Sequence, residues 1–410
     1  MSRNTTFVIV GGGLAGARAA EALRNNDFDG RIVLFSAEDA LPYERPPLSK
    51  DFLAGKKAVD EFTVHDAAWY RDHDVEFRPG TEVVGIDRQQ KTVSLPDGDA
   101  VGYDKLLLAT GSRARHPDLP GAGADRVHSL RTLADSEAID AALTTAAALA
   151  VVGGGWIGLE VAATARGRDV AVTVVEPAEL PLLGALGPEM AAVFADLHRE
   201  HGVDLRLGTG ATAITTDGLQ AVGVTLDDGT EVGADAVLVA IGAIPNVEIA
   251  EAAGLQMAQG GVAVDASLRT SDPDIFAVGD IAAAEHPLLH KRIRTEHWAN
   301  ALKQPITAAA AMMGRDAVYD ELPYFYTDQY DLGMEYVGNS DGHRRLLTRG
   351  DVDGREFSAF WLDADDRVLA GMNVNVWDGL DAIKDLIRSR APVLPDRLAD
   401  PAQPLAGVRA

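Results

Sequence analysis

The residues of this chain whose types and spacing could carry chemistry begin with Gly11, Gly13 and Gly16. In such a GxGxxG motif the first glycine allows a tight turn, the second lets a pyrophosphate approach the backbone, and the third lets the following helix pack close to the preceding strand. The N-terminus of that helix presents free N–H groups and the positive end of its dipole to the phosphates. The motif therefore predicts that this region binds a dinucleotide.

The elements that must position this motif lie on both sides of it. The β-branched run 8–10 predicts a buried strand, and the small helix formers up to Leu23 predict a helix. A second predicted strand, Arg31–Phe35, ends near Glu38. A carboxylate about 20 residues beyond the last glycine is suited to accept hydrogen bonds from a ribose. We therefore expect Glu38 at the ribose of the dinucleotide.

The same arrangement occurs a second time. Its glycines are Gly153, Gly155 and Gly158. A buried strand is predicted before them at 149–152, a second at 172–175 with Glu176 at its end, and a third at 236–242. Two such units, each with its acid, predict two dinucleotides bound by two doubly wound α/β domains.

The composition limits the remaining classes of function. The chain has 410 residues, of which 47% are hydrophobic and 24% charged, which is typical of a globular protein with two or three domains. With 37 basic and 62 acidic residues the formal charge is −25, so we expect no nucleic-acid partner. No apolar run is long enough to span a membrane. The first strand starts too early to leave room for a signal peptide, so we expect a cytoplasmic protein.

Cysteine is absent from the sequence. The chain can therefore form no disulfide, no thiolate metal site and no redox-active thiol. We expect no metal ion, and any electron chemistry must depend on a bound cofactor.

Three further stretches are expected to bring polar side chains to a ligand. In 45–50, RPPLSK, adjacent prolines stiffen the backbone and can hold Lys50 at a fixed place, although a lysine on an ordinary surface turn fits this pattern equally. The apolar run FAVG ends in Asp280, which would place a carboxylate beside a bound ligand. We expect Thr295 to cap a helix that runs towards Met313.

Two regions are predicted to be rich in β structure. Residues 75–108 alternate short β-rich runs with turns, which predicts a small sheet inserted in the first domain, and 106–109 is a buried strand closed by Thr110 and Gly111. Beyond Glu321 an antiparallel sheet is predicted from segments 333–338, 343–349, 355–362 and 367–375. The amphipathic helix predicted at 378–388 is expected to pack on that sheet.

With these residues in view, the chain resembles a known group of flavoproteins. The stretches that carry the resemblance are GGGLAG, RPPLSK, LATG, GGGWIGLE, VAIGAIPN, FAVGD, EHWANA and YTDQY, which run from residue 8 to about residue 330. They are similar to the oxygenase- and P450-coupled ferredoxin reductases of the glutathione-reductase-like superfamily, the relatives of putidaredoxin reductase and rubredoxin reductase.

The resemblance implies a domain organisation. An FAD-binding domain would be formed by residues 1–112 and 246–320, an NAD-binding domain by 113–245, and a C-terminal α+β domain with an antiparallel sheet by 321–410. The cofactors would be FAD and NADH. The protein would be a monomer or a weak homodimer.

The resemblance also implies the site residues. Lys50, Glu160 and Glu296 would be catalytic, with the two glutamates flanking the nicotinamide and Arg45 and Lys50 against the flavin. The cofactor-binding residues would be Gly11, Gly13, Leu14, Ala15, Gly16, Glu38, Arg45, Lys50, Ala109, Thr110, Gly111, Gly153, Gly155, Trp156, Ile157, Gly158, Glu160, Glu176, Ile241, Gly242, Gly279, Asp280, Glu296, His297, Trp298 and Tyr326. Asp280 would bind the ribityl chain, and Trp298 would lie near the pyrimidine side of the flavin. Tyr326 is a departure, because close relatives often carry tryptophan there.

The implied function is electron transfer from NADH through FAD to a ferredoxin that serves a P450 or a ring-hydroxylating oxygenase. The lack of cysteine agrees with this, because a flavin with no neighbouring thiol must pass its electrons to an external acceptor, and a one-electron iron–sulfur protein fits best. One alternative is an NADH dehydrogenase or oxidase with a small acceptor such as a quinone or oxygen. Another is a signalling protein resembling apoptosis-inducing factor, in which NADH controls assembly.

A basic cluster offers a docking site for an acidic ferredoxin in this acidic chain. Lys291, Arg292 and Arg294 lie together just before the helix expected after Thr295. A local positive patch steers an acidic partner although the whole molecule is negative. Arg344, Arg345 and Arg349 form a second cluster, and both clusters could also be ordinary surface charges.

Overall fold

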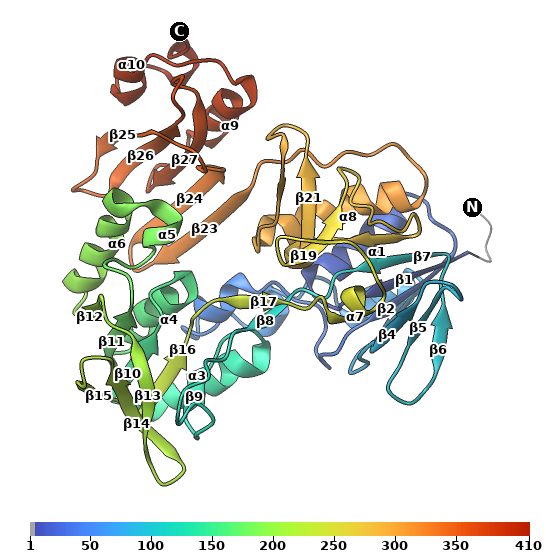
Figure 1. The fold of residues 1–410 in the computed structure, drawn as a ribbon, viewed down its shortest axis with the longest axis horizontal. Coiled ribbons are helices and arrows are strands. Elements are labelled where there is room, and N and C mark those ends of the chain that lie inside the picture. The colour runs from blue at the N-terminus through green and yellow to red at the C-terminus, as the bar shows by residue number, and fades with distance from the viewer. Residues whose placement is uncertain (1–4) are drawn as a thin grey trace. The chain divides into compact units, whose positions relative to one another are not determined.

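The computed structural model describes residues 5–410, and the chain folds into two compact units (Figure 1). Unit 1 contains the described residues up to Glu44 together with Val59–Arg113 and Pro245–Phe325, and unit 2 contains Arg45–Ala58, Ala114–Ile244 and Tyr326–Ala410. The short strands β8 (Ser112–Ala114) and β17 (Ala243–Pro245) pair where the chain passes from unit 1 to unit 2 and back.

The core of unit 1 is a five-stranded parallel sheet in the order β20-β7-β1-β2-β3. Its strands are β1 (Thr6–Val10), β2 (Arg31–Phe35), β3 (Val75–Arg78), β7 (Lys105–Leu108) and β20 (Ile275–Ala277). All but the first residues of β1 and β2 are buried, as expected for a parallel sheet that is covered on both faces. Helices α1 (Leu14–Asn25) and α8 (Trp298–Met312) pack on each other. The predicted order of strand, glycine loop, helix and strand is confirmed.

The strand β3 corrects one expectation. We expected residues 75–108 to form a separate small sheet, but β3 pairs in parallel with β2 and forms the edge of the main sheet. The inserted sheet is antiparallel and has three strands, β4 (Gly85–Asp87), β5 (Thr92–Ser94) and β6 (Ala100–Gly102). A short run of alternating polarity fits an edge strand in either sheet, so only its tertiary pairing decides between them.

Helix α8 begins later than predicted. Its first residue is Trp298, and its N-cap is His297, whose side chain makes no capping hydrogen bond. The backbone oxygen of Thr295 instead accepts a hydrogen bond from the side-chain amide of Asn300 at 3.1 Å. The prediction that Thr295 caps this helix is therefore wrong, because its partner is a side chain inside the helix. The first N–H groups of α8 are left without a side-chain cap.

The remaining elements of unit 1 surround these two sheets. Strands β18, β19, β21 and β22 form a four-stranded sheet in that order. The elements are the 3₁₀ helices η2 (Val59–Glu61) and η3 (Gly279–Ile281), the helices α2 (Ala67–Asp72) and α7 (Glu248–Ala252), and the strands β18 (Met257–Ala258), β19 (Gly261–Val264), β21 (Ala282–His286) and β22 (Lys291–Ile293).

Unit 2 contains a second five-stranded parallel sheet, in the order β12-β11-β10-β16-β9. Its strands are β9 (Val127–His128), β10 (Ala148–Val152), β11 (Ala171–Glu176), β12 (Asp204–Leu207) and β16 (Ala236–Val239). The helices of this part are α3 (Leu133–Thr145), α4 (Trp156–Arg166), α5 (Leu183–Leu186) and α6 (Pro188–Glu200). An antiparallel sheet of β13 (Ala211–Asp217), β14 (Gln220–Leu226) and β15 (Glu231–Gly233) and the 3₁₀ helix η1 (Pro46–Ser49) complete it.

The C-terminal region of unit 2 is the predicted antiparallel sheet. Its order is β23-β24-β27-β26-β25, and its strands are β23 (Tyr324–Gln329), β24 (Leu332–Gly338), β25 (Arg345–Asp351), β26 (Glu356–Leu362) and β27 (Val368–Val374). Helix α9 (Leu380–Ser389) packs on β27 and β24, as expected. Helix α10 (Pro395–Ala399) and the 3₁₀ helix η4 (Leu405–Gly407) end the chain. The predicted fold class is confirmed, and the three-domain division stays a proposal.

Candidate functional site

The first glycine motif has the geometry that each of its residues was expected to need. At Gly11, where φ is +121°, a Cβ atom would lie 2.1 Å from the backbone oxygen of Ala109. At Gly16 a Cβ would lie 1.9 Å from the oxygen of Gly11, so the helix can pack here only without a side chain. A Cβ on Gly13 would meet no atom within 4 Å. Gly13 is the N-cap of α1 and no side chain caps it, so open space and backbone N–H groups meet at the place where a pyrophosphate would bind.

Glu38 lies just beyond the end of β2 and is held by a neighbouring side chain. The Tyr43 hydroxyl donates a hydrogen bond to Glu38 Oε2 at 2.6 Å, and the Ser36 hydroxyl donates to the backbone oxygen of Glu38 at 2.8 Å. The first bond orients the carboxylate, and the second fixes the backbone that carries it. Ala109, Thr110 and Gly111 follow β7, and the Thr110 hydroxyl donates to the backbone oxygen of Asn246 at 2.6 Å.

The residues at Gly279, beside α1 and α8, also belong to the candidate site in unit 1. Gly279 has a φ of +76°, and a Cβ on it would lie 3.7 Å from the Cβ of Ala15 in the first turn of α1. Its N–H donates to Gln304 Oε1 at 2.7 Å, and the buried Asp280 follows directly. These contacts bring the predicted residues Gly279, Asp280 and Ala15 to one place.

His297 carries a polar atom that lacks a partner in this unit. Its Nδ1 is buried and finds no hydrogen-bond partner within residues 5–410, and burial lowers the pKa of this imidazole to about 4. The imidazole is therefore neutral at physiological pH. A buried nitrogen without a partner beside an uncapped helix N-terminus fits a polar ligand at this point.

The second glycine motif, in unit 2, repeats the geometry of the first. A Cβ on Gly153 would lie 2.4 Å from the oxygen of Ala240, and one on Gly158 would lie 2.3 Å from the oxygen of Gly153. A Cβ on Gly155 would again meet no atom within 4 Å, and Gly155 is the N-cap of α4 with no side-chain cap. Both motifs therefore open a phosphate-sized space at the start of their helix.

A pocket of about 520 Å³ lies at this second motif, within the usual volume range of small-molecule sites. Its lining includes five of the predicted residues, Gly153, Gly155, Glu176, Ile241 and Gly242. It also includes 117–119, which the sequence did not single out. That segment lies far from the motif in the chain and has no pattern of its own, so only the fold brings it here.

Glu176 is held by the backbone at the end of β11. Its Oε2 accepts the N–H of Gly154 at 2.7 Å, and its Oε1 accepts the N–H of Ala178 at 2.9 Å. Two N–H donors hold the carboxylate in one orientation at the wall of the pocket, where a ribose-binding acid is expected.

Lys50 and Glu160 form a buried ion pair in unit 2. Lys50 Nζ lies 2.8 Å from Glu160 Oε1, and their side chains are only 13% and 6% exposed. Lys50 Nζ also lies 5.4 Å from the centre of the Tyr326 ring, within the range of a cation–π contact. Because Lys50 is largely buried and paired with Glu160, the alternative of a lysine on an ordinary surface turn is wrong. Whether this corner contacts the flavin stays a prediction.

The prediction from the sequence did not include two polar neighbours of Glu160. The Ser49 hydroxyl donates to Glu160 Oε2, and the Thr327 hydroxyl donates to Glu160 Oε1 at 2.6 Å. Both residues lie inside the stretches RPPLSK and YTDQY, but their distance from Glu160 along the chain hides the contact.

Other predicted residues make structural contacts. The Arg45 guanidinium donates to the backbone oxygen of Arg131. The Trp156 ring meets the Phe194 ring edge-on at 5.6 Å, and Ile157 is exposed. The carboxylate of Glu296 pairs with Arg294 at 2.6 Å. The roles expected of these residues and of Leu14 and Trp298 at a cofactor stay predictions.

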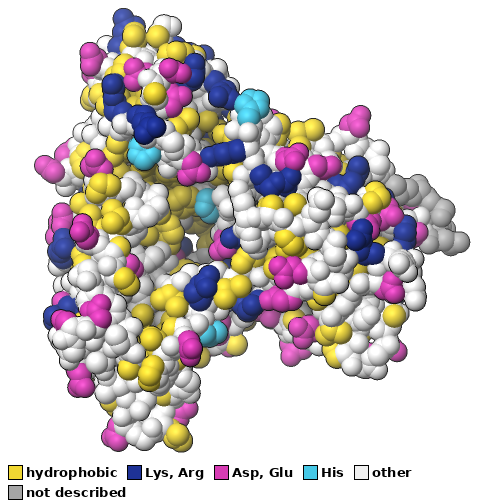
Figure 2. Space-filling view, viewed as in Figure 1, with side chains coloured by type: hydrophobic (Ala, Val, Ile, Leu, Met, Phe, Trp, Pro, Cys, Tyr) yellow, Lys and Arg dark blue, Asp and Glu magenta, His cyan; other side chains and the backbone are white. Residues whose placement is uncertain are grey.

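The two arginines of the first basic cluster are largely occupied within unit 1. Arg292 donates to the backbone oxygens of Val264 and Ala283 and pairs with Glu285 at 2.6 Å. Arg294 donates to the backbone oxygen of Asp280 at 3.1 Å and pairs with Glu296. In Figure 2 acidic and basic side chains are interspersed over the face drawn. The second cluster is similar, because Arg345 pairs with Asp366 and Arg349 donates to four backbone oxygens.

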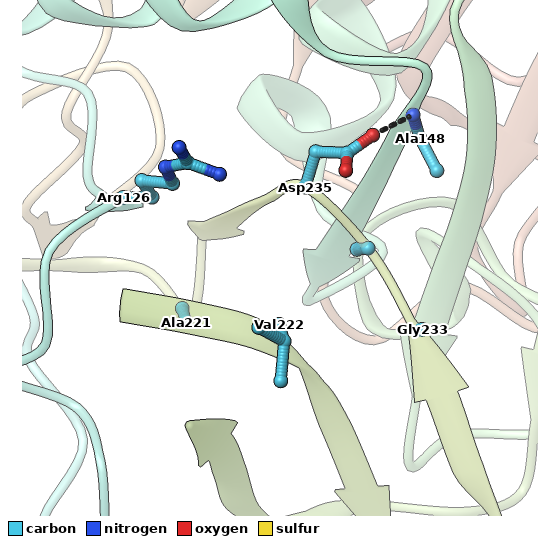
Figure 3. Close-up of a pocket in the computed structure, with 7 residues that line it drawn as sticks. Arg126, Ala148, Ala221, Val222, Gly233 and Asp235 are labelled. Atoms are coloured by element: carbon cyan, nitrogen blue, oxygen red, sulfur yellow. Dashed lines mark hydrogen bonds between the residues drawn. The ribbon is translucent and has the colours of Figure 1, made fainter. Parts of the chain in front are cut away.

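Figure 3 shows another pocket of unit 2, of about 260 Å³. Arg126 and Asp235 lie at its walls, and Asp235 accepts the backbone N–H of Ala148 at 3.0 Å. None of the predicted site residues lines it. This carboxylate serves the start of β10 and is not part of the dinucleotide site.

Two dinucleotide-binding cradles in a chain without cysteine define the class of this protein, an oxidoreductase that uses two bound nucleotides. The chain matches the pyridine nucleotide-disulphide oxidoreductase family over residues 5–305 and the reductase C-terminal family over residues 324–408. The chain belongs to the pyridine nucleotide-disulphide oxidoreductase family. This confirms the superfamily inferred from the sequence motifs.

Its relatives extend the likeness over almost the whole chain. It is 43% identical over 396 residues to the ferredoxin–NAD(+) reductase component of the anthranilate 1,2-dioxygenase system of Burkholderia cepacia, covering 96% of this chain and 97% of that protein. It is 40% identical over 410 residues to putidaredoxin reductase of Pseudomonas putida, covering 99% and 97%. Its fold matches the reductase in the crystal structure of a covalent putidaredoxin reductase–putidaredoxin complex with a TM-score of 0.95 and 39% identity, covering 99% and 98%.

The cofactors of this chain are FAD and NADH. The residues present fit both groups. At the second glycine of each motif a Cβ would meet no atom within 4 Å, so the space there is open. The helix that follows has no side-chain cap at its N-terminus, and a fixed acid lies at the end of the second strand. No helix within residues 5–410 is long and apolar enough to cross a membrane.

Proposed function

We propose that this chain takes electrons from NADH through FAD and delivers them one at a time to an iron–sulfur ferredoxin that serves a P450 or a ring-hydroxylating oxygenase. The observation that carries the proposal is the lack of any cysteine in a member of a family named for disulphide chemistry. FAD, when bound, accepts a hydride and releases electrons singly. Without a thiol to receive them, the electrons must go to an external acceptor. The relatives named as ferredoxin–NAD(+) reductases support a ferredoxin as that acceptor.

In unit 1 the proposed task is to bind FAD. The N–H groups at Gly13 bind the pyrophosphate, and Glu38, held by the Tyr43 hydroxyl, accepts hydrogen bonds from the adenosine ribose. Asp280 binds the ribityl chain. The uncapped N-terminus of α8 at His297 would provide N–H donors and a positive dipole end that favour negative charge on a bound flavin.

In unit 2 the proposed task is to bind NADH. The N–H groups at Gly155 take its pyrophosphate, and Glu176 accepts the hydrogen bonds of its adenosine ribose. A 2′-phosphate would place like charges in contact with Glu176, and the residues 177–179 offer no arginine to receive it. NADH is therefore preferred to NADPH. Glu160, oriented by Lys50, would hold the nicotinamide when NADH is bound.

The proposed ferredoxin docking site lies near Lys291, Arg292 and Arg294. Glu285 and Glu296 compensate the charges of the two arginines, which reduces the attraction of these arginines for an acidic ferredoxin. The docking site is tested at Lys291, the lysine of this cluster. Lys291→Glu is expected to raise the ferredoxin KM and to reduce its salt dependence, because charges at the rim of an interface act on association. Arg71→Glu on α2 changes the charge of unit 1 equally at a side chain 74% exposed and serves as the control. Equal effects of the two variants would remove support for this docking site.

The experiment that tests the proposed function is turnover with defined acceptors. With NADH, the enzyme should reduce cytochrome c rapidly only when a ferredoxin is added, and it should reduce oxygen and quinones slowly. Equal or faster turnover with oxygen or a quinone would contradict the proposal and favour an NADH oxidase or dehydrogenase. We also propose a cytoplasmic location, because NADH is available there, and a monomer or weak homodimer.

A further inference from the structure

Glu160 lies at one end of a chain of hydrogen bonds that runs through the interior of unit 2. Its Oε1 accepts the Thr327 hydroxyl at 2.6 Å as well as the Lys50 ammonium at 2.8 Å. The side-chain amide of Gln329 donates to Thr327 Oγ1 at 3.2 Å. Gln329 Oε1 lies 2.8 Å from His198 Nε2, so the chain links α4 to α6 through β23.

The chain continues one step beyond His198 and is almost completely buried. The Tyr330 hydroxyl lies 3.2 Å from His198 Nδ1. Thr327, Gln329 and His198 are each at most 1% exposed. A buried polar group without a partner is unfavourable, so each member of this chain depends on the orientation of its neighbour.

The direction of each bond follows from the charge of Glu160. An ionised carboxylate only accepts, so the Thr327 hydroxyl must donate to it and accept from the Gln329 amide. The Gln329 oxygen then faces His198 and requires a proton on Nε2, which leaves Nδ1 of the neutral ring to accept from Tyr330. Burial lowers the pKa of His198 to about 4, so the ring is neutral at physiological pH and this order of donors is kept.

We infer that Thr327, Gln329 and His198 are positioning residues that hold Glu160 in the orientation needed at the nicotinamide. The inference rests on the role proposed above for Glu160. If Glu160 turned away, the Thr327 hydroxyl would lose its buried acceptor, and the Gln329 amide and the His198 tautomer would have to change with it. The hydrogen-bond chain therefore restrains the carboxylate through residues that do not touch the substrate.

The test uses the FAD-loaded enzyme with two measurements, the Kd of NAD+ by calorimetry and the rate of flavin reduction by NADH in stopped flow. Thr327→Val removes the hydroxyl and keeps the shape, and Thr327→Ser restores the hydroxyl. Thr215→Val is the matched control, because the Thr215 hydroxyl bonds with the Thr225 hydroxyl in the sheet of β13 and β14. We expect Thr327→Val to weaken NAD+ binding or slow reduction by about tenfold, the range of one hydrogen bond to a charged group. Thr327→Ser and Thr215→Val should stay near the wild-type values.

A double-mutant cycle separates positioning from packing. In a Glu160→Gln background, Thr327→Val should have no further effect if it acts through the carboxylate. Two results would overturn this inference and leave the role of Glu160 intact. One is the same tenfold effect of Thr327→Val in both backgrounds. The other is wild-type behaviour of Thr327→Val when Glu160→Gln alone is impaired. Wild-type behaviour of Glu160→Gln itself would overturn the proposed role of Glu160 and this inference with it. If the valine variant does not fold, Gln329→Met breaks the chain at the next link and is compared in the same way.

Discussion

Replacing Lys50 by methionine tests the corner on which the proposed chemistry of unit 2 depends. Methionine keeps an unbranched chain but removes the ammonium group, so Glu160 loses its ionic partner. The Ser49 and Thr327 hydroxyls still donate to the carboxylate after the change. The variant therefore isolates the contribution of the ion pair from that of the hydrogen bonds.

The expected size of the effect follows from the burial of the pair. Its atoms are 2.8 Å apart, with side chains 13% and 6% exposed, and removal of one partner of a buried ion pair costs about 3–5 kcal/mol. Because two donors remain at Glu160, we expect the lower end, about 3 kcal/mol. For a unit of this size that lowers the unfolding midpoint by about 6–12 °C. NADH should also reduce the flavin more slowly, since the carboxylate is no longer held in place.

Thermal unfolding followed by circular dichroism, together with stopped-flow reduction, measures both effects. Lys384→Met is the control, because Lys384 and Asp381 form a pair on α9 whose side chains are 33% and 94% exposed, and exposed pairs contribute little. If the two variants had the same midpoint and the same reduction rate, the reasoning from the buried pair would be refuted.

Three further predictions address other residues. Glu176→Ala should raise the ratio of kcat/KM for NADPH to that for NADH by about tenfold, and equal kcat/KM for the two nucleotides in the wild-type enzyme would contradict the role of Glu176. Tyr326→Trp should preserve ferredoxin reduction and Tyr326→Ala should weaken flavin binding, and normal flavin affinity and rates in the alanine variant would remove Tyr326 from the flavin site. The pKa of His198 is lowered by burial to about 4 from 6.5, so the unfolded state binds a proton first and stability falls by about 3 kcal/mol as the pH is lowered from 6.5 to 4. His198→Gln should flatten this dependence of the unfolding midpoint on pH.

The two dinucleotide cradles could be predicted from the sequence because their determinants are local. Gly16 and Gly158 are required by the backbone oxygens of Gly11 and Gly153 in their own motifs, although Gly11 and Gly153 also lie against the backbone oxygens of Ala109 and Ala240, which are distant in the chain. Each set lies within six residues, so the motif carries its own geometry. The parallel sheets follow from continuous apolar runs, which are typical of strands buried on both faces.

The polar chain beyond Glu160 could not be predicted in this way. Its members come from η1, α4, α6 and β23, and Thr327 and Glu160 are 167 residues apart in the chain. His198 belongs to an amphipathic helix, where a buried histidine has the same pattern as any core position. The prediction for Thr295 was wrong for a related reason. A threonine before a helix caps it only if its oxygen accepts a backbone N–H, and here Thr295 accepts from the side-chain amide of Asn300.

The basic cluster at 291–294 shows why charge patterns are weaker than glycine patterns. Its spacing in the sequence suggested a positive surface patch. In the strand β22, however, successive side chains point to opposite faces, and Arg292 donates to backbone oxygens of two neighbouring strands. A guanidinium has five N–H donors, and it can use them to stabilise the fold instead of binding a partner.

The C-terminal sheet has a second role in this arrangement. Strand β23 brings Tyr326 to the Lys50 ammonium and Thr327 to the Glu160 carboxylate, so one strand contacts both members of the ion pair. The remainder of the pair's surroundings comes from η1 and α4, far earlier in the chain. A nucleotide-binding region without β23 would leave Glu160 with one hydroxyl donor fewer and Lys50 without its aromatic neighbour. The C-terminal region therefore contributes directly to the surroundings of the buried ion pair.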